Sequence, residues 1–145
     1  LEFYKPYYDA HCREKTAPYP GITALMQRLR DAGVKQAVVS NKPDSAVKEL
    51  AELFFHGLIE SAVGESETVR LKPCPDAVLA AAKLMGVSKD ECVYVGDSEV
   101  DIETARNAGM DCISVAWGFR NEDMLRAEGA SLIVHNADEL FDALK

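Results

Sequence analysis

The stretch VYVGDSEVD, Val93–Asp101, decides how this chain is expected to fold. An apolar run meets Gly96 and then Asp97, and a second acid, Asp101, follows about one helical turn later. This pattern is typical of a buried parallel strand that leads through a tight turn into a helix. Ligands of open α/β sheets bind outside the carboxyl ends of the strands, so both acids fall where a ligand would bind. Two carboxylates there suit Mg²⁺, which takes one or two of them and fills its shell with water and phosphate oxygens.

Apolar runs of strand length alternate with helical patterns along the rest of the chain. The expected strands are 37–39, 58–63, 92–95, 112–116 and 132–134, and the expected helices are 22–32, 43–56, 75–85, 97–109, 121–128 and 137–144. This alternation, with short loops, predicts an α/β protein with a three-layer, Rossmann-like parallel sheet and helices on both faces. Residues 1–16, rich in aromatic side chains, are expected to be helical as well.

Composition limits the partners of the protein. The chain has 145 residues, 48% of them hydrophobic and 28% charged, which is ordinary for one globular domain. Its net charge of −8 argues against binding to nucleic acid or an anionic membrane, but it allows a small phosphorylated substrate. The four cysteines have no zinc-type spacing, and we expect reduced thiols in a cytoplasmic protein. The sequence contains neither a signal-peptide pattern nor an apolar run of membrane-spanning length.

Two further polar groups fall near predicted strand ends. Ser40 and Asn41 follow an apolar strand just before a helix, where a hydroxyl and backbone N–H groups can bind an anion. Lys72 precedes Pro73, which restricts its backbone, and its ammonium could neutralise a phosphate oxygen. Taken alone, Ser40 or Asn41 could simply cap the next helix, and Lys72 could be a solvated loop lysine.

The acidic turn also has an ordinary structural interpretation. Asp97 could be a helix N-cap, and Asp101 could be an acid in the first helical turn that is favoured by the helix dipole. That interpretation does not account for Gly96, where a close approach of the backbone to a ligand would require the absence of a side chain. Three polar groups at one end of one sheet therefore favour a functional site.

These motifs, in this order, resemble those of the haloacid dehalogenase-like hydrolase superfamily. Ser40–Lys42, Lys72–Pro73 and Gly96–Asp101 are similar to its second, third and fourth motifs. Pro18–Gly21 and Trp117–Arg120 resemble the phosphoglycolate phosphatase branch. In that family a nucleophilic aspartate attacks phosphorus to give an aspartyl-phosphate, and Mg²⁺ shields the charge.

The resemblance implies a role for each matching residue. Ser40 and the Asn41 backbone would hold phosphoryl oxygens, and Lys72 would offset charge on the phosphate and the nucleophile. Asp97 would bind Mg²⁺ directly, and Asp101 would stand behind it, orienting Asp97 or a metal-bound water.

The first motif of the family, a strand ending in D-x-D, does not occur in this sequence. We therefore expect residues 1–16 to be a remnant of the last helix of the family's cap, and residues 17–145 to be an incomplete core domain. The sheet would lack its central first strand, and the missing N-terminal segment or a second copy of the chain would have to fill the gap.

The leading functional hypothesis is a Mg²⁺-dependent phosphatase of a small phosphomonoester such as phosphoglycolate, with this chain alone inactive. The alternative is a non-catalytic regulatory module that binds phosphate or metal. A receiver-like domain is disfavoured because its acid pair would lie at the first strand. A mutase or a pyrophosphatase of the same superfamily stays open.

Overall fold

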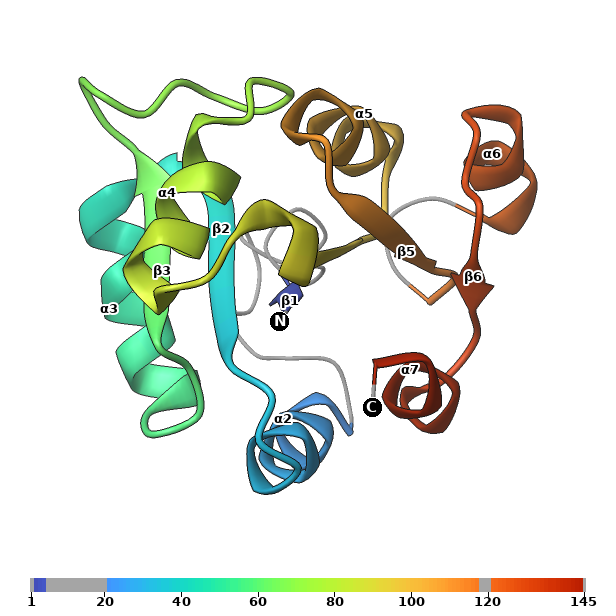
Figure 1. Cartoon of the computed structure of the whole chain (residues 1–145), viewed down its shortest axis with the longest axis horizontal. Helices are drawn as coiled ribbons and strands as arrows, with labels where there is room; N and C mark the ends of the chain where they lie inside the picture. The colour runs from blue at the N-terminus through green and yellow to red at the C-terminus, as the bar shows by residue number, and fades with distance from the viewer. Residues whose placement is uncertain (1, 5–20, 118–120, 145) are drawn as a thin grey trace.

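Six parallel strands form the predicted sheet in the computed structural model, which describes residues 2–4, 21–117 and 121–144. The strand order within these residues is β3-β2-β1-β4-β5-β6, and every neighbouring pair is parallel (Figure 1). The strands are β1 (Glu2–Tyr4), β2 (Gln36–Pro43), β3 (Ser61–Glu65), β4 (Val93–Gly96), β5 (Asp111–Val115) and β6 (Ile133–Val134). The helices are α2 (Ile22–Asp31), α3 (Asp44–Phe55), α4 (Asp76–Met85), the short 3₁₀ helix η1 (Lys89–Glu91), α5 (Glu99–Ala108), α6 (Glu122–Ala127) and α7 (Ala137–Leu144). None of the helices in these described ranges is long and apolar enough to cross a membrane.

Glycine and proline set several helix boundaries, as the sequence predicts. Helices α4 and α5 end at Gly86 and Gly109, whose φ angles of 74° and 71° are left-handed. Glycine reaches that region without the steric cost of a side chain, so the last turn can close. Pro43 directly precedes α3, because its fixed φ suits a helix start and its missing N–H is no loss there.

Alternate residues of the strands pack into two separate hydrophobic cores, one on each face of the sheet, which confirms the three-layer α/β prediction. Val38 and Val95 pack with α2, α3 and α7 on one face of the sheet. Ala37, Val39 and Tyr94 point the opposite way and pack with α4 and α5. Both faces of the central strands are therefore buried, as expected for strands with continuous apolar runs.

The first residues of the chain form a strand, so the prediction of a helix starting at the N-terminus is wrong for them. Glu2–Tyr4 lie between β2 and β4, at the position that the sequence predicted this chain would lack. Without them, both neighbouring strands would expose unpaired backbone groups inside the sheet, and pairing removes that cost. Residues 5–16 lie outside the described part of the chain, so a cap helix there stays a prediction.

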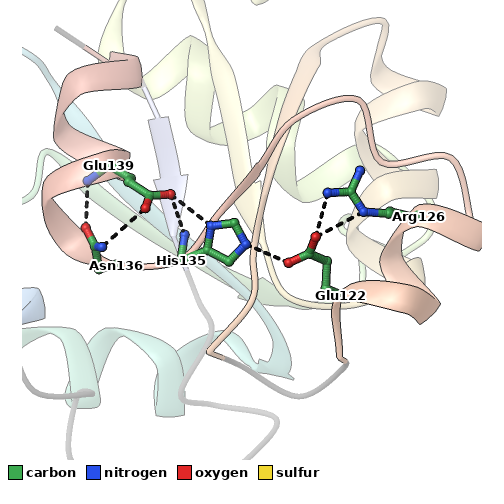
Figure 2. A network of polar contacts seen from close by, with 5 residues as sticks. All are labelled: Glu122, Arg126, His135, Asn136 and Glu139. Atoms are coloured by element: carbon green, nitrogen blue, oxygen red, sulfur yellow. Dashed lines mark hydrogen bonds and ion pairs between the residues drawn. The ribbon is translucent and has the colours of Figure 1, made fainter.

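A polar network ties the last two helices together (Figure 2). His135 Nε2 lies 2.6 Å from Glu122 Oε1, and its Nδ1 lies 3.0 Å from Glu139 Oε1. Arg126 Nε donates to Glu122 Oε2 at 3.0 Å, and the Glu139 N–H donates to Asn136 Oδ1 at 2.9 Å. A single imidazole thus connects the first turn of α6 with the first turn of α7.

Candidate active site

The carboxyl edge of the sheet gathers most of the buried polar side chains. Ser40 lies in β2, Asp97 directly follows β4, and Lys72 lies in the loop from β3 to α4. These three residues and Asp101 are all buried, with exposures of 6% or less. Since lysine and aspartate are rarely buried unless they are paired, their partners define the site.

Asp101 accepts four hydrogen bonds through its two carboxylate oxygens. Its Oδ1 accepts from Lys72 Nζ at 2.9 Å and from the Tyr94 hydroxyl at 2.8 Å. Its Oδ2 accepts from the Asp97 N–H at 2.9 Å and from the Ser98 hydroxyl at 3.2 Å. A carboxylate offers about four lone-pair positions, so Asp101 has none left for a metal ion. This geometry supports Asp101 as the residue that orients Asp97.

The acidic turn is not a capping arrangement. Ser98, not Asp97, is the N-cap residue of α5, and its side chain makes no capping hydrogen bond. Instead, Asp101 reaches back from the first turn of α5 to the Asp97 N–H. The capping interpretation of Asp97 is therefore wrong.

Gly96 is required for a reason other than the predicted one. A Cβ added to Gly96 would overlap the Cβ, Cγ and Oδ2 atoms of Asp101. The group that approaches the backbone closely is thus a side chain of the same protein and not a ligand. Any larger residue at position 96 would push Asp101 away from its donors.

Both the ammonium and the backbone of Lys72 are held by residues that are distant in the sequence. Its ammonium lies 2.9 Å from Asp101 Oδ1 and 3.3 Å from the Tyr94 hydroxyl, with the side chain only 1% exposed. Its backbone N–H donates to Asn41 Oδ1 at 2.7 Å, and Asn107 Nδ2 donates to the carbonyl of Pro73 at 2.9 Å. The Lys72–Pro73 peptide bond is cis. Lys72 is therefore a fixed residue, and its interpretation as a solvated loop lysine is wrong.

Ser40 and Asn41 do not cap α3. Pro43 is the N-cap residue of that helix, without a side-chain capping bond, so this alternative is also wrong. Ser40 Oγ accepts the N–H of Lys42 at 3.2 Å, near the carboxyl end of β2. The Asn41 side chain holds Lys72, and the phosphate contacts predicted for Ser40 and the Asn41 backbone stay a prediction.

Three members of this cluster were missed by the sequence interpretation: Tyr94, Ser98 and Asn107. Tyr94 carried a usable signal, because a tyrosine inside a fully buried strand generally needs a partner for its hydroxyl. Burial, and after it the Asp101 carboxylate, raises the pKa of Tyr94 well above its ordinary value of 10. Its hydroxyl therefore stays protonated and donates.

The Asp97 carboxylate fits part of a Mg²⁺ site. Asp97 is fully buried at the end of β4, and one such carboxylate suits an ion that keeps several water or phosphate ligands. No group of three or more His, Cys, Asp or Glu residues that could hold a metal occurs within 2–4, 21–117 and 121–144. Asp97 is thus the one candidate direct ligand that the sequence and the cluster both favour.

The Trp117–Arg120 motif lies only partly within the described residues. Trp117 follows β5 and is half-buried, whereas residues 118–120 of the same motif are not described. Three cysteines that were expected to be reduced, Cys74, Cys92 and Cys112, are free thiols.

A cavity of about 240 Å³ lies between α3 and β3 and shares no residue with the cluster. The presence of a cavity therefore does not by itself indicate the site.

Residues 1–115 match the family model "Haloacid dehalogenase-like hydrolase". The chain belongs to this family. It is 31% identical over 133 residues to a phosphoglycolate phosphatase of Pseudomonas putida, covering 91% of this chain and 48% of that protein. It is 33% identical over 144 residues to a phosphoglycolate phosphatase of Xanthomonas campestris, covering 97% of this chain and 64% of that one.

Solved structures support the same assignment. A Lactobacillus delbrueckii protein, assigned by inference as a phosphoglycolate phosphatase, superimposes with a TM-score of 0.88 at 52% identity, over 96% of this chain and 58% of that chain. A predicted phosphatase from Clostridium acetobutylicum gives a TM-score of 0.80 at 27% identity, over 95% and 66% of the two chains. The family prediction, in its phosphoglycolate phosphatase-like branch, is thereby confirmed. The present chain spans about half to two thirds of the length of these relatives.

Proposed function

We propose that this chain is the metal and phosphate side of a Mg²⁺-dependent phosphatase that hydrolyses a small phosphomonoester such as phosphoglycolate. The observation that carries the proposal is the buried Lys72–Asp101 pair beside Asp97. Ser40 is also buried and lies toward the carboxyl end of β2. The phosphoglycolate phosphatases among the relatives favour the substrate class. The wide spacing of the cysteines, which predicts reduced thiols, favours a cytoplasmic location.

Each residue would act on charge that develops at the phosphoryl group. The Ser40 hydroxyl and the Asn41 N–H would donate hydrogen bonds to phosphoryl oxygens, and the Lys72 ammonium would offset part of the negative charge on those oxygens. Asp97 would hold Mg²⁺, which when bound neutralises phosphate charge. Asp101 would keep the Asp97 backbone in place through the bond to its N–H.

The nucleophile has to come from outside this sequence, which contains no D-x-D pair. In a longer chain that aspartate would form the covalent aspartyl-phosphate, and water would then hydrolyse it. We expect negligible turnover from the 145 residues alone, because electrostatic stabilisation cannot replace the attacking group.

An assay with p-nitrophenyl phosphate and Mg²⁺ tests this proposal. The 145-residue chain should give no turnover. A form extended upstream by a strand ending in D-x-D, which would take the place of Glu2–Tyr4 between β2 and β4, should be active. Asp97→Ala should lower the activity of the extended form on the order of a hundredfold or more. Asp123→Ala, an exposed acid on α6, should leave that activity unchanged. Turnover by the short chain that depends on Asp97 would contradict the proposal, and phosphate binding by an extended but inactive form would favour the regulatory module.

A further inference from the structure

The Tyr94 hydroxyl is a structural part of the site that the proposed chemistry does not use. Tyr94 is fully buried, and its ring packs in the core beneath α4 and α5. Its hydroxyl lies 2.8 Å from Asp101 Oδ1 and 3.3 Å from Lys72 Nζ, and these two atoms are 2.9 Å apart. The three polar atoms thus form a closed triangle at the top of an apolar core.

The direction of each bond in the triangle follows from the groups involved. The tyrosine has a single proton, which it donates to Asp101, so its oxygen lone pairs accept from the ammonium. Lys72 has three N–H donors, and within the described residues Asp101 and Tyr94 are the acceptors that its ammonium meets. An ammonium shared in this way is fixed in direction and can still engage another acceptor.

Asp101 does not depend on Lys72 alone. If the ammonium turned toward a phosphate oxygen, the Tyr94 hydroxyl would still donate to Asp101 Oδ1. The Asp97 N–H and the Ser98 hydroxyl would still donate to Oδ2. The buried carboxylate would therefore keep at least three donors, which lowers the cost of releasing Lys72.

We propose that Tyr94 is a positioning residue for Lys72. The Tyr94 hydroxyl directs the Lys72 ammonium toward the carboxyl edge of the sheet, and it keeps Asp101 hydrogen-bonded when that ammonium binds phosphate. This inference deepens the proposed function, since it rests on Lys72 meeting a phosphoryl oxygen. A tyrosine that served only as packing would be replaced by phenylalanine without consequence for Lys72.

Hydrogen exchange of the Lys72 ammonium in the ¹⁵N-lysine-labelled chain tests the positioning directly. Its slowed ammonium signal should appear at neutral pH and vanish in Lys72→Met. Tyr94→Phe keeps the ring and removes one of two acceptors, so exchange should become roughly threefold to tenfold faster. Ser98→Ala is the matched control, because it removes a hydroxyl from Asp101 Oδ2 without touching Lys72, and exchange should stay within about twofold.

Titration with inorganic phosphate at pH 7 tests the link to function on the same signal. The wild-type Lys72 signal should shift on binding, and Tyr94→Phe should weaken the phosphate affinity roughly threefold to tenfold. In a Lys72→Met background, with affinity followed by ³¹P NMR, Tyr94→Phe should cause no further loss.

The outcomes separate the two proposals. An unchanged exchange rate in Tyr94→Phe, an equal acceleration in Ser98→Ala, or no slowed Lys72 signal in the wild type would overturn the role of Tyr94. Slowed exchange that depends on Tyr94, without any phosphate-induced shift, would support the positioning and refute the phosphate site instead.

Discussion

Replacing Asp101 by asparagine keeps the shape of the side chain and removes the charge that faces Lys72. The lysine and aspartate side chains are 1% and 0% exposed, so neither can recover its interactions from water. After the change, residue 101 has one amide oxygen and one NH₂ group, so either the Lys72 ammonium or the Asp97 N–H loses its acceptor there. Removing one partner of a buried ion pair generally costs about 3–5 kcal/mol, and we expect Asp101→Asn to lower the free energy of unfolding by that amount.

The reverse change should cost less. Lys72→Met leaves the Asp101 carboxylate with the Tyr94 hydroxyl, the Asp97 N–H and the Ser98 hydroxyl. Because the remaining charge is still well hydrogen-bonded, we expect a loss of about 1–3 kcal/mol. The loss in the double variant should be smaller than the sum of the single losses, since both changes break the same interaction.

Urea unfolding at pH 7, followed by circular dichroism and by the fluorescence of the single tryptophan, measures these differences. Glu103→Gln is the control, because it neutralises an exposed acid of the same helix and should change the free energy by no more than about 0.5 kcal/mol. If Lys72→Met destabilises the protein as much as Asp101→Asn, the hydrogen-bond assignment of Asp101 is refuted.

Gly96→Ala should lower the free energy of unfolding by about 1–3 kcal/mol, because the added methyl overlaps Asp101; an unchanged urea midpoint would contradict this packing. The His135 imidazolium donates hydrogen bonds to the carboxylates of Glu122 and Glu139, and these bonds, the one to Glu122 first, raise the pKa of His135 above 6.5. The contribution of His135 to stability is therefore full below pH 6.5 and is lost as the pH rises through the folded-state pKa. An NMR titration of His135 should show this, and Glu122→Gln should bring its pKa back toward 6.5. Burial, together with the charge of Asp101, raises the pKa of Cys112 to about 12, so iodoacetamide at pH 8 should modify this thiol only after unfolding, as mass spectrometry can check.

Local patterns in the sequence predicted most of the elements correctly. Short apolar runs bounded by glycine and proline gave the strands around Val38 and Val95, and Gly86 and Gly109 gave the helix ends. The strand expected at residues 58–63 is instead Ser61–Glu65, and Leu58 lies in the turn after α3. An apolar residue that packs beneath a helix end looks the same in sequence as the first residue of a strand.

The gathering of Lys72, Asp97 and Asp101 at one edge of the sheet was predictable because strand ends converge, whereas their pairing was not. The sequence placed Lys72 near the site but did not pair it with Asp101. That pairing depends on how the loop before α4 runs, and Asn41 and Asn107, which are 31 and 34 residues from their partners, fix the loop there. The strand at Glu2–Tyr4 was missed for a similar reason. It pairs with β2 and β4, which are distant in the sequence, and no local sequence pattern predicts this pairing.

The two oxygens of Asp101 face different neighbours, and this gives the carboxylate a role in communication. Oδ1 meets the ammonium of Lys72, and Oδ2 meets the backbone of Asp97. The carboxylate is a rigid plane, so a rotation that follows the ammonium must also move the oxygen that holds the turn after β4. A rotation of this carboxylate would therefore reach the Asp97 backbone, and the Tyr94 and Ser98 hydroxyls that hold Asp101 oppose it when Lys72 engages another acceptor.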